Sequence, residues 1–347
     1  MFEREDLDAA VAAGVLDRRA RDALVTFVAQ RRAGEAEPDA ERFRLLTGFN
    51  DIFVTIACGL LLAAAASLGS SVAAGLGAAA GAALAWGLAE YFTRVRRMAL
   101  PSIVLLLAFV GGVFLATMAF TKPLLGEDGP SVAGVVLGNA GPPLVIAALA
   151  ATLAAALHWW RFRVPITVAA GTAALVGLVA SAAAAGLGIT GNPLLAIMLV
   201  CGLGVFALAM QYDMADRLRV TRKTDVAFWL HLLAAPLIVH PIFALTGLLD
   251  RTPAPGGAVV VLIVYAGLTL VALAVDRRAL LVSALIYVLW AIQALWAAGR
   301  GVEAGFGLTA LTIGTFLVLL SAAWGRIRGA LVRQLPPALA ERLPVTA

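Results

Sequence analysis

The chain has 347 residues, of which 62% are hydrophobic and only 14% are charged, with a formal net charge of +5. Soluble globular domains carry about 25% charged residues, so this composition excludes an ordinary soluble fold and indicates a membrane protein. The positive charge does not indicate nucleic-acid binding, because the basic residues lie in short loops between apolar stretches, not in patches interleaved with aromatic residues.

The N-terminal region is polar, and residues 1–33 predict a small helical hairpin. Apolar residues follow helical spacing there, Gly14 is expected to end the first helix, and Asp17 can cap the second. Such a hairpin is too small to bury much surface alone. We therefore expect it in the cytosol, docked on the bundle, on lipid headgroups or on another subunit, with a cytosolic protein as a candidate partner. Residues 34–49, which include Pro38, form the expected linker.

Residues 50–324 predict an all-α, polytopic transmembrane helix bundle of about ten helices. Each apolar stretch has roughly 19–25 residues, enough to cross a hydrocarbon layer of about 30 Å at a rise of about 1.5 Å per residue. The first two stretches are separated only by Gly69-Ser70-Ser71, where we expect the turn. The expected segments are residues 50–69, 72–92, 99–120, 135–158, 164–188, 193–213, 225–247, 257–275, 280–298 and 305–324.

Most basic residues lie on one of the two sides of this expected bundle. Of the 26 Lys and Arg residues, 23 lie in the two terminal tails and in the gaps after segments two, four, six and eight. The remaining five gaps together hold three. Positive charge resists translocation across the membrane, so the basic gaps belong on the cytoplasmic side. Both termini are therefore predicted to be cytoplasmic.

The even-numbered segments begin near residues 72, 135, 193 and 257, which is a spacing of about 60 residues, and each ends in a polar or basic turn. This favours tandem hairpins in one orientation. A five-plus-five inverted repeat is the alternative. We find no paired Gly/Pro-broken helices at matching places in the two halves, so we prefer hairpins.

The C-terminal tail, residues 325–347, predicts an amphipathic helix that ends at Pro336-Pro337. Ile327, Leu331 and Leu335 share one face, and arginines surround it. We expect this tail to lie in the inner headgroup layer as an anchor.

The seventh segment is the most unusual, because it combines two histidines with two prolines. At about 100° per residue, Trp229, Pro236 and His240 lie on one face, whereas His231 points nearly the opposite way. Proline removes a backbone donor and frees a carbonyl for a ligand or a neighbour. Alternatively, both histidines are hydrogen-bonded to neighbouring helices and the prolines only shape the bundle. The candidate cavity or ligand contacts are Trp229, His231, Pro236, His240 and Asn139.

The loop between segments six and seven is the richest polar region of the chain. Its basic side chains are candidate contacts for a cytosolic partner or an acidic headgroup. These are Arg217, Arg219, Arg222 and Lys223.

The same loop also allows a simple anchoring role, with local ion pairs at helical spacing. Thr224 or Asp225 would then cap the seventh helix. The expected local pairs are Asp213–Arg217 and Asp216–Arg219.

No pattern indicates catalysis, a metal or a cofactor. No segment carries an acid or base near its middle, which disfavours an ion-coupled carrier. The three histidines show no repeated spacing, so we expect neither haem nor a metal site. Cys58 and Cys201 both lie in apolar segments and do not suggest a disulfide. No nucleophile–base pair is present, so no catalytic residue is predicted.

The chain resembles bacterial multi-pass inner-membrane proteins grouped in families of unknown function, which also begin with a polar helical hairpin. The resemblance covers most of the chain and implies the bacterial cytoplasmic membrane, but it implies no substrate and no active-site residue. It is carried by GLAEYFTRVRRMAL (87–100), YDMADRLRVTRKTDVAFWLHLLAAPLIVHP (212–241) and VDRRALLVSALIYVLW (275–290).

For function, we prefer a non-enzymatic scaffold or sensor whose hairpin and basic loops meet a cytosolic partner. The alternative is a transporter of a small neutral or amphipathic solute, through a cavity bordered by the seventh segment. A lipid-modifying membrane enzyme is a third hypothesis, which the absence of intramembrane acids disfavours. The sequence leaves the oligomeric state open.

Overall fold

The computed structural model describes residues 10–24, 26, 49–73, 75–125, 141–217, 219, 221–246, 255–300, 302–340 and 343–344. The chain forms a large unit, Phe43–Pro344, and a small unit made of Met1–Arg42 with Val345–Ala347. The described residues are helical and contain no strand, which confirms the all-α fold class. Asn139 and most of the expected linker lie outside the described residues.

In the small unit, residues 10–12 and 18–24 are helical, and a turn joins them. Gly14 lies in this turn with a φ of 71°. Glycine adopts this left-handed conformation without steric cost, which explains why the first helix ends where the sequence predicted. Val15 and Leu24 are exposed apolar residues of this unit.

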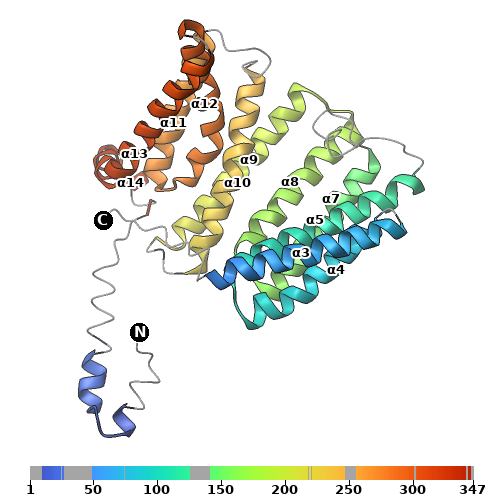
Figure 1. Cartoon of the computed structure of the whole chain (residues 1–347). Helices are drawn as coiled ribbons and strands as arrows, with labels where there is room; N and C mark the ends of the chain where they lie inside the picture. The colour runs from blue at the N-terminus through green and yellow to red at the C-terminus, as the bar shows by residue number, and fades with distance from the viewer. Residues whose placement is uncertain are drawn as a thin grey trace. The chain divides into compact units, whose positions relative to one another are not determined.

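The large unit is built of helices that pack beside their neighbours in the chain (Figure 1). Short turns join most of them, so successive helices run antiparallel. The helices are α3 (Phe49–Val72), α4 (Leu76–Ala89), the π-helix η1 (Glu90–Val95), α5 (Ala99–Leu124), α7 (Pro142–Phe162), α8 (Ile166–Leu187), α9 (Asn192–Met214), α10 (Arg222–Leu245), α11 (Pro255–Val275), α12 (Ala279–Arg300), α13 (Val302–Gln334) and α14 (Pro337–Ala340).

Seven of these helices are long and apolar enough to cross a membrane: α3, α5, α7, α8, α9, α10 and the Gly305–Gln334 part of α13. The other expected segments are also helical. Helix α4 has 14 residues and continues directly into η1. Helices α11 and α12 contain the shorter apolar stretches Val259–Val275 and Ala284–Gln293. Large apolar side chains are exposed on outward faces, such as Leu153 and Leu311, as lipid contact requires.

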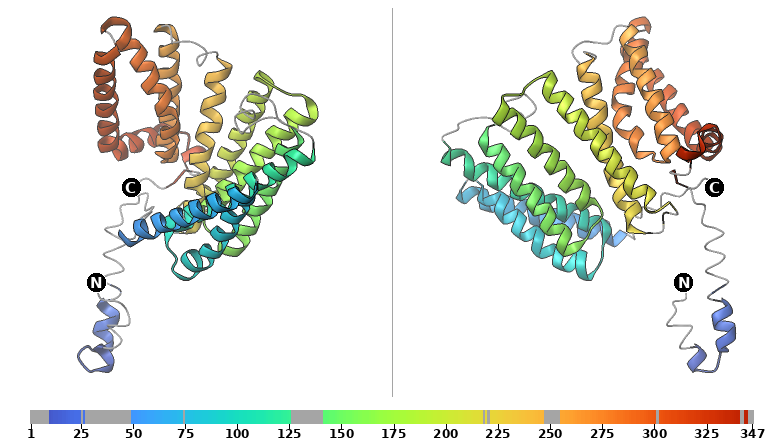
Figure 2. Two further views of the ribbon diagram at one scale, coloured as in Figure 1. Left: turned by 45° about the vertical axis from the view of Figure 1, so that its right-hand side comes forward. Right: turned by 180° about the vertical axis from the view of Figure 1, so that it is seen from behind.

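Four hydrophobic clusters hold the described helices together. One joins α3, α4, α5 and α7 to the start of α8, and a small one also joins α5 to α7. Another joins α8, α9 and α10, and the last joins α10 to α11, α12 and α13. Helices α9 and α10 therefore lie between the earlier helices and α11–α13 (Figure 2). The turn that ends α9 and the turn that ends α11 are consequently neighbours.

The expected turn at Gly69-Ser70-Ser71 is wrong by a few residues. Helix α3 continues to Val72, and Gly75, with a φ of 88°, makes the turn instead. Serine side chains can bond back to the helix, as Ser71 Oγ does to the carbonyl of Leu68. Gly69-Ser70-Ser71 is therefore accommodated inside α3, and the helix ends close to the next glycine, Gly75, which adopts positive φ.

The basic turns after η1, α7, α9 and α11 share a backbone feature. Each contains one non-glycine residue at positive φ, and these are the only such residues in the part of the chain that the structure describes. They are Arg97, Arg163, Arg219 and Asp276. Figure 1 shows these four turns along one edge of the unit.

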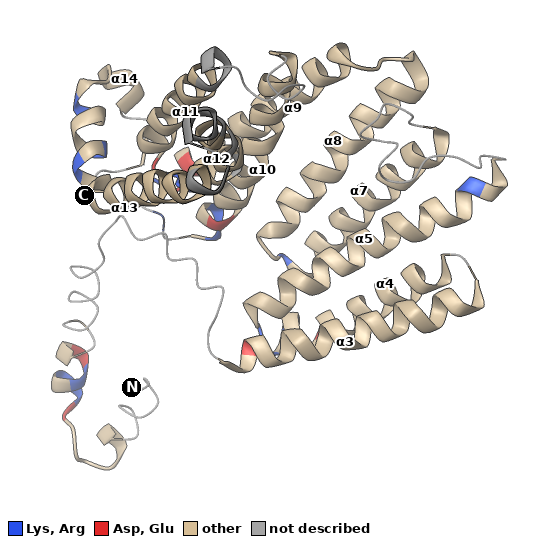
Figure 3. Ribbon diagram, turned by 45° about the horizontal axis from the view of Figure 1, so that its top comes forward, with Lys and Arg blue, Asp and Glu red and all other residues tan. Residues whose placement is uncertain are grey.

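The C-terminal tail differs in part from its prediction. Helix α13 continues without a break past Gly325 to Gln334. The part that carries the arginines runs in another direction from the rest of the helix (Figure 3). Arg328, expected among arginines facing headgroups, is instead 2% exposed, because it is drawn into contacts inside the unit.

The close approach of α9 to α10 yields a test of this packing. A Cβ on Gly202 would lie 2.8 Å from the carbonyl carbon and oxygen of Leu237, whereas a Cβ on Gly204 would meet nothing within 4 Å. We expect Gly202→Ala to lower the free energy of unfolding by about 1–3 kcal/mol through overpacking. Gly204→Ala on the same helix should be neutral or stabilising by up to about 1 kcal/mol. Unfolding in mixed micelles measures both, and equal effects would contradict the packing.

Candidate functional site: a buried charged cluster

Acidic and basic side chains from α9, α10, α13 and the two basic turns after α9 and α11 are buried together. Ionisable groups are costly to bury in a membrane protein, so such a group of residues is a candidate functional site. We call it the charged cluster; its members are Asp213, Arg219, His231, Asp276, Arg277, Trp324 and Arg328.

Asp213 and Arg277 form the centre of the charged cluster, and their side chains are at most 1% exposed. Arg277 Nε donates to Asp213 Oδ2 at 3.2 Å, and its Nη2 donates to Oδ1. The same Nη2 donates to the carbonyl of Thr224 at 3.3 Å. A bidentate arginine–carboxylate pair of this kind joins the end of α9, the start of α10 and the α11–α12 turn.

His231, in the third turn of α10, completes this group. Its Nε2 lies 2.9 Å from Asp213 Oδ2, and because an ionised carboxylate only accepts, the ring donates. Its Nδ1 is buried and has no hydrogen-bond partner among the described residues. A charged imidazolium beside Arg277 would bury an unpaired donor, so the geometry favours the neutral ring.

Asp276 organises the other half of the charged cluster. Its Oδ2 accepts from Arg219 Nη1 at 2.6 Å and its Oδ1 accepts from Trp324 Nε1 at 2.7 Å. The carbonyl of Asp276 also accepts from Arg219, at 2.9 Å. Both Asp276 and Arg219 have positive φ, with values of 58° and 54°. This backbone conformation costs about 1–2 kcal/mol for a residue with a Cβ.

Residues 343–344, at the end of the described chain, are bonded to arginines beside or within the charged cluster. Arg328 Nε lies 3.7 Å from Asp276 Oδ1, and its Nη2 donates to the carbonyl of Pro344 at 2.7 Å. Arg217 Nε donates to the carbonyl of Leu343 at 3.0 Å. The segment at residues 343–344 is therefore held against the α9–α10 turn by two arginines.

The local ion pairs expected in this turn are wrong. Asp213 pairs with Arg277, 64 residues away, and Arg219 pairs with Asp276, 57 residues away. Helical spacing favours the local partner only while both residues stay in one helix, and α9 ends at Met214.

The expected caps of α10 are also wrong. Thr221 precedes the helix, and its side chain accepts from the backbone of Lys223. Asp216 in turn accepts from the backbone and hydroxyl of Thr221 and from the hydroxyl of Thr224. Thr224 therefore stabilises the loop side chain of Asp216 instead of capping the helix.

The four basic side chains expected to meet a partner or headgroups divide into two groups. Arg217 and Arg219 are bonded within the large unit, and the side chain of Arg219 is only 9% exposed. Arg222 and Lys223 are exposed at the start of α10. Arg217 is exposed as well, so an external anion can reach three of the four side chains directly, and only Arg219 is enclosed.

The residues singled out in α10 do not converge on one cavity. His231 is fully buried, whereas Pro236 and His240 are exposed, so the two histidines face different ways as expected. His240 Nδ1 lies 2.9 Å from the Tyr287 hydroxyl of α12, so both histidines are hydrogen-bonded to neighbouring helices. Trp229 is half-buried between two hydrophobic clusters.

Pro241 removes the N–H that would bond the carbonyl of Leu237. That carbonyl is covered by α9 at Gly202. The backbone opened by this proline therefore serves helix packing and is not exposed to a ligand.

A second polar contact joins the η1 and α7 ends. Arg161 donates to both carboxylate oxygens of Glu90, at 2.8 and 2.7 Å, and Arg94 lies 3.4 Å from the same group. Glu90 therefore has a local partner, Arg94 at i+4, and a closer, bidentate partner in Arg161. Nearby, His158 is buried among aromatic rings and its Nδ1 lies 3.2 Å from the Thr167 hydroxyl.

The charged cluster is suited to holding helices together, because its carboxylates accept hydrogen bonds from arginine, histidine or tryptophan side chains of other elements. Within the described residues, no group of three or more His, Cys, Asp or Glu is placed to hold a metal ion. No known protein family, curated protein or solved structure shows significant similarity to the chain. Seven apolar helices, together with this site, are compatible with an integral membrane protein.

Removing one partner of the central pair provides a test. Arg277→Met leaves the Asp213 carboxylate buried without its main partner, and we expect the free energy of unfolding to fall by about 3–5 kcal/mol. Asp213→Asn combined with Arg277→Met should recover much of this loss, because no uncompensated charge remains. Unfolding in mixed micelles measures each variant.

Glu90→Gln is the matched control, because it weakens a pair whose side chains are 31% and 34% exposed. It should cost about 1 kcal/mol or less. If Arg277→Met were as mild as Glu90→Gln, the central role of the buried pair would be wrong.

Proposed function

We propose that the chain is a bacterial cytoplasmic-membrane protein that crosses the bilayer ten times, keeps both termini in the cytoplasm, and acts as a non-enzymatic scaffold or sensor. The observation that carries this proposal is the charged cluster. It connects the α9–α10 turn, the α11–α12 turn, α13 and the segment at residues 343–344 through buried ion pairs. A site of this kind fixes the arrangement of cytoplasmic elements or changes it when one contact is lost.

The ten-span topology is supported by the basic turns. Arg97, Arg163, Arg219 and Asp276 recur at intervals of roughly 60 residues, each at positive φ in a turn rich in arginine. Repetition of the same backbone feature favours tandem hairpins over an inverted repeat, in which the two halves would carry it on opposite sides. The resemblance to uncharacterised inner-membrane proteins points to the same membrane.

Residues 1–33 are the proposed contact with a cytosolic protein. Val15 is 80% exposed and Leu24 is 42% exposed, which leaves apolar surface available on a small helical unit. The exposed Arg222 and Lys223 provide a second surface, suited to an acidic partner or to anionic headgroups.

A transporter is the second candidate, because Pro236 and His240 share an exposed face of α10. In that function, this face would border the path of a small neutral or amphipathic solute. Cysteines at both positions would then react with water-soluble reagents, whereas lipid-facing positions would not.

The topology is tested by replacing Cys58 and Cys201 with alanine and placing single cysteines at Lys223 or Leu187. Both positions are exposed, and Leu187 lies at the opposite end of its helix from the basic turn after α7. We expect a membrane-impermeant maleimide to label Lys223→Cys only in inverted vesicles and Leu187→Cys only in intact spheroplasts. Labelling of Lys223→Cys from the outside would overturn the proposed orientation.

The scaffold function is tested by in vivo photo-crosslinking from Leu24, with a tag at the C-terminus. We expect a discrete adduct with one cytosolic protein, because the exposed apolar face of the small unit is the proposed contact. The same cross-linker at Leu187, on the opposite side, should give no such adduct. Deletion of residues 1–33 should leave an inserted bundle that no longer retains the partner; unchanged retention would count against the proposal.

A further inference from the structure

Helices α11, α12 and α13 enclose a groove that the charged cluster does not use. Helices α11 and α13 pack mainly on α12, so α12 forms the floor and the other two form the walls. The wider part is a cavity of about 490 Å³ with Val288 and Ile292 on the floor and Phe316 on one wall. A cavity of this size suits a small organic ligand or part of a lipid.

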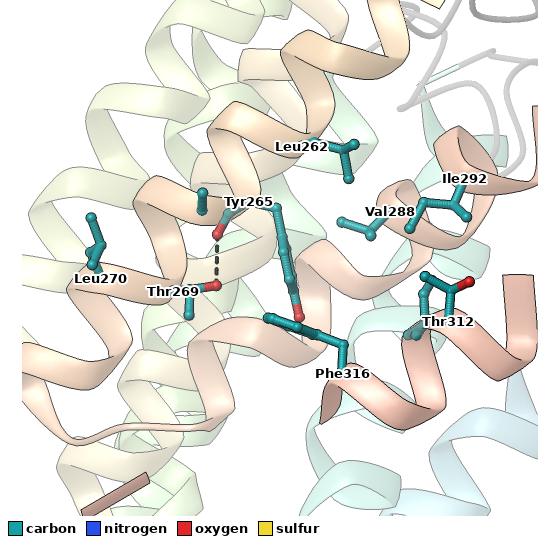
Figure 4. A pocket seen from close by; sticks show the side chains of 10 residues that line it. Leu262, Tyr265, Thr269, Leu270, Val288, Ile292, Thr312 and Phe316 are labelled. Carbon is teal, nitrogen blue, oxygen red and sulfur yellow. Dashed lines mark hydrogen bonds between the residues drawn. The ribbon is translucent and has the colours of Figure 1, made fainter. Parts of the chain in front are cut away.

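Tyr265 on α11 places a hydroxyl group in this apolar groove. Its side chain projects across the groove toward Phe316 of α13 (Figure 4). The residue is 6% exposed, and its hydroxyl has no hydrogen-bond partner among the described residues. A buried hydroxyl without a partner is unfavourable, so a ligand that supplies an acceptor here gains affinity.

The groove continues toward the basic edge of the unit. A second cavity of about 200 Å³ is also lined by Tyr265, and it reaches Arg278, Ser321 and Trp324. The Arg278 guanidinium lies over the Trp324 ring, 5.0 Å from its centre, and the side chain is exposed. Among the described residues no carboxylate pairs with it. One end of the groove is therefore apolar and the other ends at an available cation.

The length and polarity of the groove match one lipid in one leaflet. On α13 its lining extends from Thr312 to Trp324, which is about 18 Å at a rise of about 1.5 Å per residue. A leaflet contributes roughly half of a hydrocarbon layer of about 30 Å. Basic residues between helices on the cytoplasmic side are known to bind anionic headgroups.

We propose that this groove binds one anionic glycerophospholipid. An acyl chain occupies the larger cavity, an ester carbonyl accepts from the Tyr265 hydroxyl, and the phosphate lies beside Arg278. The inference deepens the proposed sensor function, on which its regulatory consequence rests, by naming the ligand class. Trp324 connects the two, because its ring lies beneath Arg278 while its Nε1 donates to Asp276 of the charged cluster.

The test uses the full chain in nanodiscs of a zwitterionic ester lipid, titrated with fluorescent phosphatidylglycerol. Loss of Arg278 removes a charged contact, so Arg278→Gln should weaken binding about tenfold. Arg163→Gln, which removes another exposed cation from a different basic turn, should leave binding unchanged. Tyr265→Phe should weaken ester-linked phosphatidylglycerol about fivefold and leave its ether-linked analogue unaffected, because only the ester offers the carbonyl.

Three outcomes would overturn the assignment. Binding to Arg278→Gln equal to that of Arg163→Gln would mean that the lipid only surrounds the protein. An equal effect of Tyr265→Phe on ester and ether lipids would remove the carbonyl contact. Displacement by a long polyprenyl phosphate at lower concentration than by unlabelled phosphatidylglycerol would identify a different occupant.

The folded state and the proposed function are checked separately. Each variant is compared with the parent by size-exclusion profile and unfolding midpoint. Retention of the Leu24 adduct is then measured in Arg278→Gln. If lipid binding follows the prediction while no adduct forms in any variant, the lipid site is supported and the scaffold or sensor function is wrong. If the adduct forms but lipid binding does not follow the prediction, only the lipid site is wrong.

Discussion

The buried contact between Asp213 and Arg277 is the constraint on which the arrangement of the C-terminal half depends. Both side chains are almost fully enclosed, and each would be strongly unfavourable there without the other. The pair therefore requires that the end of α9 and the α11–α12 turn stay together. Because Thr224 and His231 bind the same two groups, the position of α10 follows as well.

The helices were largely predictable, because an apolar run of sufficient length forms a helix in lipid whatever its neighbours are. The ends of the helices were less predictable where the turn residues between two apolar runs were few. At the α3–α4 turn, Gly69 and two serines looked like a break, yet α3 continues past them and Gly75 makes the turn at positive φ. Whether each helix crosses the bilayer depends on its depth, which a hydrophobic pattern does not specify.

The pairing within the charged cluster was not predictable from spacing. In the sequence, Asp276 and Arg277 were visible only as part of a polar turn, Arg328 only as one of the arginines of the tail, and nothing singled out Trp324. Each has its partner 48 to 64 positions away in the sequence, on another element of the bundle. The sequence did contain one signal. Asp276, Arg277 and Arg278 are consecutive between two apolar segments, and burying such charges is costly unless distant residues of opposite charge pair with them.

Helix α13 gives the groove and the charged cluster a common element. It contributes Phe316 to the wall of the groove, Trp324 to both places and Arg328 to the charged cluster. A helix is stiff along its axis, so a ligand that moves its groove wall also moves the indole that bonds Asp276. A phosphate beside Arg278 would further draw that cation away from the Trp324 ring. In the proposed function, the side chain of Trp324 therefore connects the lipid groove directly to the charged cluster, without a long series of intervening contacts.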